Sequence, residues 1–309
     1  MPADIVRKTE IFMKKALLTI LACLVLFMTG CTISQATVPM VTQSGQLPVL
    51  PVNIKWYGTA AILLEHEGTK LLFDPFFFLR DRCFKQPADE LAAVENILVT
   101  HGHFDHIADI PAILKQGVET ATVYCTAKPR ETLLAKGVDE TRIQQITPGD
   151  YLIFGPFEVR VLKGKHVVFD AGLVIKTSFN PRVLANWNNL RYILKENRIC
   201  AEAGETVVYD ISVANKRILL LGTLNLDNNT EYPKGVDLLI LPFQGRSDIN
   251  KYAMSFIDRL QPKEVLLHHF DDPFPPISAN VETEPFISLM RQKHPDIPVI
   301  YLSKSTPWW

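Results

Sequence analysis

Apolar and polar side chains alternate along several short stretches of the chain, and this pattern predicts β-strands. Residues 52–57 alternate in this way, and residues 70–73 run into Asp74 and Pro75, where proline ends the hydrogen-bonded ladder. Within the strand predicted at residues 237–242, the five residues after Asp237 are apolar without interruption, which is typical of a strand buried on both faces. The predicted strands cover residues 52–57, 60–65, 70–73, 96–100, 121–125, 151–154, 157–162, 205–213, 217–221, 237–242, 264–267 and 299–302.

Helical patterns fill several of the gaps between these strands. Residues 129–136 have helical character, and Gly137 follows them as a helix-ending glycine would. Residues 171–205 are less regular, and we expect an inserted, partly helical segment there that either covers a site as a lid or extends the edge of the core. The predicted helices cover residues 88–94, 110–116, 129–136, 252–260 and 281–293.

Three histidines and a carboxylate lie within six residues, at His101, His103, Asp105 and His106. A predicted strand leads directly into them, and a strand that ends in a loop can aim several side chains at one point. Imidazole and carboxylate groups are the usual protein ligands of zinc and related divalent metals. The chain has only 8 histidines, so chance is a poor explanation of this clustering, and the motif predicts a metal site.

More histidines stand at the ends of two later strands. His166 follows the strand at residues 157–162, and His268 and His269 follow the strand at residues 264–267. A lone histidine at a strand end is usually structural, but His166 lies downstream of a ligand cluster, which favours it as a further ligand. Because side chains alternate along a strand, His268 and His269 should face opposite ways, so only one of them is expected to reach the metal site.

The composition is that of a globular protein and argues against one class of partner. The chain has 309 residues, of which 47% are hydrophobic and 21% charged, and its formal net charge is -1. Without an excess of lysine and arginine to neutralise phosphates, we expect no nucleic-acid partner. The cysteines beyond the N-terminal segment, Cys83, Cys125 and Cys200, lack Cys-x-x-Cys spacing, and we expect them in the core.

The N-terminal segment has the pattern of an export signal. A basic start at Met13 precedes the apolar residues 16–28, and Met28-Thr29-Gly30-Cys31 resembles a bacterial lipobox, in which the cysteine is lipidated. Translation starting at Met13 would suit this signal, and an uncleaved membrane anchor is the alternative. Residues 1–31 would then be a signal peptide, residues 32–51 a flexible tether, and residues 52–309 a domain held by Cys31 to a membrane of the bacterial cell envelope.

These motifs together resemble the metallo-β-lactamase superfamily. The resemblance rests on the strand pair ending in Asp74-Pro75, the His-x-His-x-Asp-His run from His101 to His106, His166 at a strand end, and His269 before an aromatic residue. Residues 56–64 and 71–75 are similar to its branch of lactonase-like and phospholipase D-like hydrolases. The resemblance implies an α/β, four-layer αββα sandwich of two mixed sheets with helices outside and metals at the strand-end rim.

The resemblance also implies a set of ligands and roles. The metal would be one or two zinc ions, with manganese or iron as alternatives, and two groups of ligand residues would hold it. His269 is preferred to His268 because the last ligand of the family directly precedes an aromatic residue. Asp105 would also orient a metal-activated hydroxide, and Asp74 would hold ligand histidines by hydrogen bonds. The two groups are His101, His103 and His166 for the first, and Asp105, His106 and His269 for the second.

One position departs from the family pattern. The family places a metal-bridging aspartate after a glycine at a strand end, whereas this chain has Gly222-Thr223. A threonine hydroxyl carries no negative charge, so the second metal should bind more weakly unless Asp227 replaces the missing carboxylate.

Two functions follow from these observations. The first is a metal-dependent hydrolase acting on a lactone, a phosphodiester or a phospholipid-like substrate. The second is a metal-binding surface lipoprotein with weak or no catalysis, which the missing aspartate favours. A β-lactamase proper fits the branch resemblance less well. The partners expected are a small-molecule or lipid-like substrate and a membrane, and the oligomeric state is left open.

Overall fold

The computed structural model describes residues 50–76, 91, 93–274 and 277–301. These residues belong to one compact unit, Gly45–Trp309. The predicted signal peptide with Met13 and Cys31, nearly all of the tether, Cys83 and most of the helix predicted at residues 88–94 lie outside the described residues.

Strands β1 to β6 form a six-stranded sheet in the order of the sequence. The first three strands are antiparallel, and the later ones run parallel to their neighbours. The turn between β2 and β3 has Glu67 and Gly68 at positive φ angles, a geometry that suits tight hairpins. The strands are β1 (Asn53–Gly58), β2 (Ala61–His66), β3 (Thr69–Phe73), β4 (Asn96–Leu98), β5 (Thr122–Cys125) and β6 (Ile143–Gln145).

A second, seven-stranded sheet has the order β13-β12-β11-β10-β9-β8-β7. Its first four strands along the chain are antiparallel, and the last three add in parallel. The predicted all-apolar strand is β11, which is buried along its whole length between two parallel neighbours. The strands are β7 (Tyr151–Phe154), β8 (Phe157–Lys163), β9 (Val207–Val213), β10 (Lys216–Leu221), β11 (Leu238–Pro242), β12 (Val265–His268) and β13 (Val299–Tyr301).

The helices agree with the sequence pattern more closely in the first half of the chain than in the second. Helix α4 coincides with its prediction, whereas α9 begins at Ile249 and α10 at Glu284. Proline near the start of α10 sets its later beginning, because proline suits the first turn of a helix. The helices are α3 (Phe104–Ile107), α4 (Ile110–Gln116), α5 (Ala127–Ala135), the 3-10 helix η2 (Glu140–Arg142), α6 (Ala171–Ser178), α7 (Pro181–Ala185), α8 (Trp187–Ile199), α9 (Ile249–Leu260) and α10 (Glu284–Lys293).

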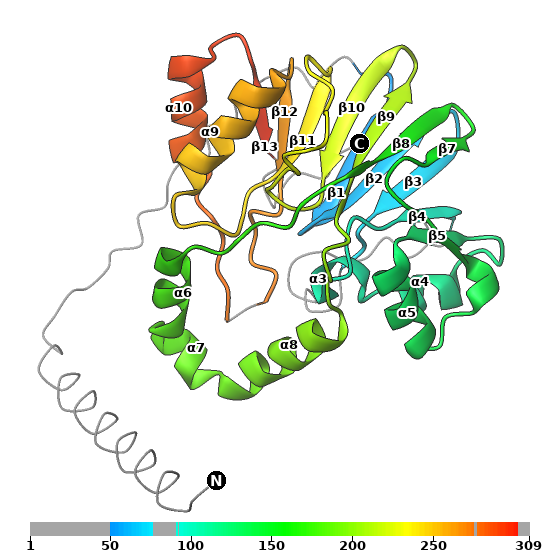
Figure 1. The fold of residues 1–309 in the computed structure, drawn as a ribbon, viewed down its shortest axis with the longest axis horizontal. Helices are drawn as coiled ribbons and strands as arrows, with labels where there is room; N and C mark the ends of the chain where they lie inside the picture. The colour runs from blue at the N-terminus through cyan, green and yellow to red at the C-terminus, as the bar shows by residue number, and fades with distance from the viewer. Residues whose placement is uncertain (1–49, 77–90, 92, 275–276, 302–309) are drawn as a thin grey trace, which may run out of the picture. The chain divides into compact units, whose positions relative to one another are not determined.

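The two sheets pack face to face, and helices cover their outer faces (Figure 1). Apolar side chains of both sheets share one core, in which the rings of Phe73 and Tyr209 lie 5.4 Å apart. The Tyr209 hydroxyl donates to the Val99 carbonyl at 2.7 Å, so the sheets are also joined next to the histidine cluster. Helices α4 and α5 lie outside the first sheet, and α9 and α10 outside the second (Figure 1). The predicted αββα sandwich is confirmed.

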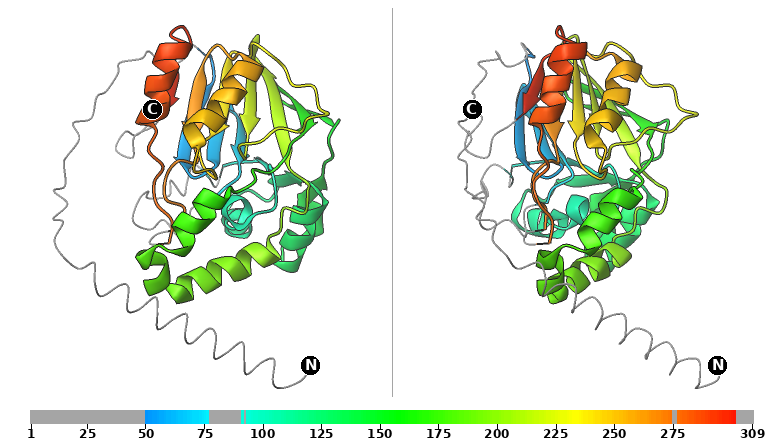
Figure 2. Two further views of the ribbon diagram at one scale, coloured as in Figure 1. Left: turned by 60° about the vertical axis from the view of Figure 1, so that its left-hand side comes forward. Right: turned by 90° about the vertical axis from the view of Figure 1, so that its left-hand side faces the viewer.

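The segment predicted as partly helical forms α6, α7 and α8, which cross one end of the sandwich near α3 (Figures 1 and 2). Among the side chains of this segment that the structure describes, Val183, Ile193 and Cys200 are buried, and most of the other large apolar ones are exposed. We call residues 168–199 the helical arm. Within the described residues, no helix combines the length and the apolar character that crossing a bilayer requires.

Candidate metal centre

The histidine cluster lies at the carboxyl end of β4. Three backbone features place it there: β4 runs parallel to β3 and β5, His103 is extended, and α3 begins at Phe104. The first turn of α3 then directs Asp105 and His106 back toward the strand end, beside Asp74 at the end of β3. Parallel strands end at one edge of their sheet, so side chains from β3 and β4 meet there.

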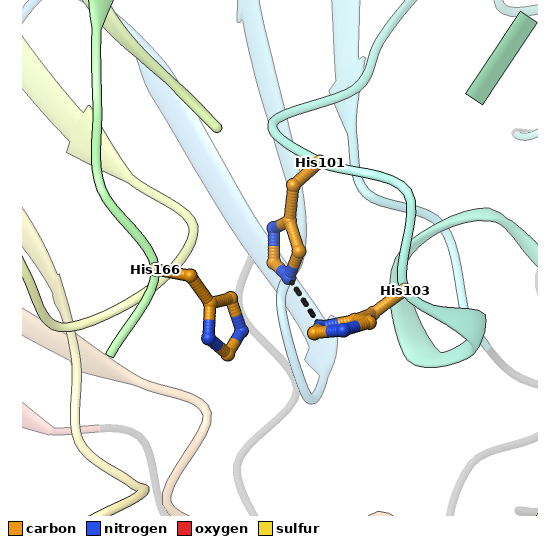
Figure 3. A group of neighbouring side chains, drawn as sticks. All are labelled: His101, His103 and His166. Atoms are coloured by element: carbon orange, nitrogen blue, oxygen red, sulfur yellow. Dashed lines mark hydrogen bonds between the residues drawn. The ribbon is translucent and has the colours of Figure 1, made fainter. Parts of the chain in front are cut away.

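The first group of donors is His101, His103 and His166, and each offers one ligand atom within 4.8 Å of the others. His101 Nε2 faces His103 Nδ1 at 3.1 Å (Figure 3). The ring of His166, which follows β8 in the other sheet, lies 4.5 Å from that of His103. The structure therefore brings together the three residues expected for the first site.

Hydrogen bonds determine which nitrogen of each ring is available. His166 Nδ1 donates to the Val167 carbonyl at 2.8 Å, which leaves Nε2 with its lone pair. The Thr100 hydroxyl donates to Asp74 Oδ2 at 2.5 Å, so its oxygen accepts from His101 Nδ1 at 3.1 Å. The Nε2 lone pair of His101 then points at His103.

The second group is Asp105, His106 and His269. Asp105 lies between the two rings, with Oδ1 3.9 Å from His106 Nε2 and Oδ2 3.4 Å from His269 Nε2. His106 Nδ1 forms an ion pair with Asp74 Oδ2 at 2.9 Å. His269 leaves the end of β12 with a φ of 57°, and its N–H donates to the Thr59 carbonyl at 2.9 Å. A left-handed residue, rather than strand alternation, turns this side chain into the site.

The first group is electrically neutral near pH 7. Burial lowers the pKa of His101 well below its ordinary value, and the neighbouring imidazoles lower it further. Burial also lowers the pKa of His103 to about 4 and depresses that of His166, although the Val167 carbonyl opposes the latter shift. Neutral imidazoles are the form that binds metals.

The pKa values of the second group are shifted in directions that favour opposite charges. Burial by itself would raise the pKa of the Asp105 carboxyl, but His106 and His269 outweigh it and hold this pKa below its ordinary value. Burial would likewise lower the pKa of His106, yet Asp74 and Asp105 raise it. Because a ligand imidazole must be neutral, the raised pKa of His106 makes metal binding at the second group compete with protons.

The geometry fits a divalent transition metal. Nitrogen ligands around a tetrahedral zinc ion with bonds of about 2.0–2.1 Å lie about 3.3 Å apart, close to the 3.1 Å between His101 Nε2 and His103 Nδ1. In addition, His269 Nδ1 is buried and has no hydrogen-bond partner among the described residues. Five imidazoles and one carboxylate suit zinc, iron or manganese better than calcium or magnesium.

Comparison with known proteins agrees with this geometry. A family model described as a β-lactamase superfamily domain matches residues 69–270. The chain belongs to the metallo-β-lactamase superfamily. A UPF0173 protein of Pyrococcus furiosus is 25% identical over 224 residues, which are 71% of this chain and 83% of that protein. A UPF0173 metal-dependent hydrolase of Azorhizobium caulinodans is 31% identical over 141 residues, 45% of this chain and 57% of the relative.

Solved structures share the metallo-β-lactamase fold with this chain. The metallo hydrolase Igni18 from Ignicoccus hospitalis superposes with a TM-score of 0.54 at 16% identity, covering 82% of this chain and 96% of that one. The metallo-β-lactamase fold protein YhfI from Bacillus subtilis gives a TM-score of 0.50 at 16% identity, with 80% and 89% covered. At these identities the likeness shows the fold.

The remaining candidates from the sequence take different places in this metallo-β-lactamase domain. Thr223 lines the pocket of the histidine cluster, where its hydroxyl accepts from the Val167 N–H at 3.1 Å. Asp227 is not brought to the site, because its carboxylate accepts from the Asn229 N–H and the Thr230 hydroxyl, both at 3.0 Å. His268 stays within β12, fully buried, and its Nε2 donates to the Leu221 carbonyl at 2.9 Å.

Asp74 lies beside a ligand histidine, where the sequence predicted it. Gly222 leaves room for the hydrogen bonds between Thr100 and Asp74. Asp74 receives the Thr100 N–H at 2.7 Å and the Thr100 hydroxyl, in addition to the ion pair with His106. A Cβ at Gly222 would overlap the Thr100 hydroxyl. Glycine is therefore required for steric reasons at the residue before Thr223.

The pocket around the two groups has a volume of about 320 Å³ and an apolar wall. Sequence reasoning missed Asn197 of α8, Phe274 and Gln244, which follows the end of β11. Gln244 Oε1 is buried without a hydrogen-bond partner among the described residues. The only feature of the sequence that could have indicated Gln244 is its position just beyond a predicted parallel strand, because ligands of open α/β sheets bind at such strand ends. The wall consists of Val167, Phe169, Leu194, Leu224, Pro242 and Phe274.

Proposed function

We propose that the protein is a metal-dependent hydrolase that holds one or two zinc ions at the histidine cluster. The observation that carries this proposal is the convergence of two three-residue donor groups in one pocket. The relatives named metal-dependent hydrolases support the same class of reaction. When bound, the metal supplies activation of water and stabilisation of negative charge on the attacked group.

The chain's own residues have separate tasks in this reaction. His101, His103 and His166 hold the first ion, and His106 and His269 hold the second with Asp105. The Asp105 carboxylate is ionised near pH 7, so it can accept a hydrogen bond from the attacking water and orient it. Gln244 and Asn197 offer amide groups at the pocket wall to position the polar end of a substrate.

The pocket favours a substrate with one apolar and one hydrolysable end. Apolar side chains line it together with the donor groups, and no lysine or arginine lines it within the described residues. A lactone, a phosphodiester or a phospholipid-like ester meets this description, and residues 56–64 and 71–75 favour the lactonase-like and phospholipase D-like branch. The expected lipid anchor at Cys31 would bring the domain close to lipid substrates in the cell envelope.

A second candidate is a metal-binding lipoprotein without turnover. Thr223 supports this candidate, because it provides a hydroxyl where the superfamily pattern has a bridging carboxylate, and Asp227 is held elsewhere. The second ion would then bind weakly, and the first group alone would be filled.

Metal content and turnover separate the two candidates. If both donor groups of the hydrolase are filled, purified protein should contain more than one equivalent of metal and cleave bis(p-nitrophenyl) phosphate or a simple lactone. His103→Ala should abolish cleavage with one ion or two. The control is His294→Ala, because His294 pairs with Asp258 on the surface. Activity that survives His103→Ala would refute the proposed site, whereas bound metal without turnover on a broad ester panel would favour the binding candidate.

A further inference from the structure

The helical arm exposes an unusual concentration of apolar side chains. Of the 11 large apolar side chains that are exposed in the described part of the chain, 9 belong to residues 168–199. Phe179 is 70% exposed and Trp187 is 54% exposed. A folded domain rarely leaves such a group uncovered unless it is an interaction surface. The nine are Val168, Phe169, Val174, Ile175, Phe179, Trp187, Tyr192, Leu194 and Ile199.

Basic side chains are interleaved with this apolar surface. On α8, Trp187, Arg191, Leu194 and Arg198 follow at helical spacing, and all four are exposed. This exposed face therefore offers apolar side chains that can enter the boundary of the acyl chains and basic side chains that can reach anionic head groups.

The charges of the arm are not balanced within the protein. The arm contains five lysines and arginines but only two acidic residues. Both acidic residues are engaged internally: Asp170 accepts from the Ser247 N–H and hydroxyl, and Glu196 pairs with Lys136 at 3.3 Å. By contrast, no ion pair within the described residues involves the basic side chains Arg182, Arg191, Lys195 and Arg198.

We propose that the helical arm is a membrane-binding surface that rests on an anionic lipid bilayer. Unpaired cations attract the lipid head groups, and the exposed aromatic and aliphatic side chains enter the interface between head groups and acyl chains. The tether expected at residues 32–51 would span at most about 70 Å, so an anchor at Cys31 would keep the arm within reach of the bilayer. Phe169 and Leu194 belong to both the arm and the pocket wall, so this surface is continuous with the pocket.

Hydrogen exchange of the arm tests this surface directly. The full chain is reconstituted through its own N-terminus into phosphatidylcholine vesicles with and without phosphatidylglycerol, and exchange is followed by mass spectrometry. We expect amides of residues 171–199 to exchange several-fold more slowly on the phosphatidylglycerol vesicles, and high salt should remove this protection. Equal exchange on both kinds of vesicle would overturn the proposal.

Matched variants identify the side chains responsible. The triple change Ile175→Ser, Phe179→Ser, Trp187→Ser removes apolar groups that do not line the pocket, and it should abolish the protection. The control is Ile153→Ser, because Ile153 of β7 is 66% exposed but lies outside the arm, and it should change nothing. Protection that persists in the triple variant would overturn the proposal.

Charge variants provide a second test if the triple variant fails to fold. Arg191→Gln with Lys195→Gln should weaken the contact on the order of thirtyfold, whereas Lys115→Gln with Lys251→Gln should not. Arm protection that rises with protein concentration in vesicle-free samples, together with a dimeric mass by light scattering, would assign the surface to a second copy instead and overturn the proposal. None of these measurements depends on hydrolysis, so the result is independent of the catalytic proposal.

Discussion

The Asp74 carboxylate and the His106 ring meet at 2.9 Å, between Oδ2 and Nδ1, and both side chains are buried. Asp74 also receives the hydroxyl of Thr100, whose oxygen contacts His101 Nδ1. One carboxylate at the end of β3 therefore orients one ring from each donor group. Such outer contacts keep metal-binding imidazoles in the required tautomer and orientation.

Replacing this carboxylate should weaken metal binding without removing a ligand. Asp74→Asn keeps the size of the side chain but loses its charge, so it cannot pair with both the Thr100 hydroxyl and His106. We expect metal affinity to fall roughly 10–100-fold in chelator competition. Asp210→Asn is the matched control, because Asp210 is equally buried but pairs with Arg160 and Arg217. Equal affinities for Asp74→Asn and the wild type would contradict the orienting role.

Gly222→Ala should disturb the contacts of Thr100 with Asp74 and His101 by steric overlap. The new Cβ would displace the Thr100 hydroxyl from its position between Asp74 and His101. We expect a loss of about 1–3 kcal/mol in the free energy of unfolding by urea denaturation, together with weaker metal binding. Gly137→Ala is the control, because Gly137 has a positive φ of 85° but no atom close to its missing Cβ. That variant should lose some stability and keep its metal affinity.

The sequence could indicate the centre of the site because its ligands either lie close together in the sequence or follow predicted strands. His101, His103, Asp105 and His106 lie within six residues, and His166 follows a predicted strand downstream of them. The histidine after β12 was expected at the same rim because the motifs resemble the metallo-β-lactamase superfamily. The structure brings these residues together. That they bind metal stays a prediction.

Contacts between distant single residues could not be predicted in this way. Gln244 and Asn197 reach the pocket from separate elements, and neither belongs to a motif. Nothing in the sequence near His269 indicated its left-handed backbone, which decides where this side chain points. The exposure of the arm could not be predicted either, because an apolar residue in a predicted helix is assigned to the core until the packing of its neighbours is known.

Introducing an aspartate at position 223 should strengthen the second metal position. Thr223 lines the pocket beside both donor groups, and a carboxylate there would supply the charge that its hydroxyl lacks. We expect Thr223→Asp to raise affinity for a second equivalent of zinc by roughly tenfold or more, measured by calorimetry of the metal-free protein. Thr223→Asn tests shape without charge and should not have this effect.

A parallel change at Asp227 shows whether that carboxylate contributes. Because Asn229, Thr230 and Lys163 surround its oxygens, Asp227→Asn should leave the metal stoichiometry unchanged. A lost equivalent in Asp227→Asn would mean that Asp227 moves into the site when metal binds.

His268 should make the stability of the metal-free protein depend on pH. Burial lowers its pKa to about 3 in the folded protein, whereas an unfolded histidine titrates near about 6.5. Below about pH 6.5 the unfolded chain therefore takes up a proton that the folded chain does not. The stabilisation is complete above that pH and is lost progressively as the pH falls toward 3.

Between about pH 7.5 and about pH 5, this residue alone should remove about 2 kcal/mol from the free energy of unfolding. His268→Gln does not titrate, and its amide can still donate to the Leu221 carbonyl that His268 Nε2 contacts at 2.9 Å. Urea denaturation in the presence of a chelator should thus show a smaller loss between the two pH values in the variant, by about that amount. If both proteins lose the same free energy of unfolding, the pKa of His268 is not lowered in the folded state. A hydrogen-bond acceptor beside the ring would then have to stabilise the protonated form against its burial in β12.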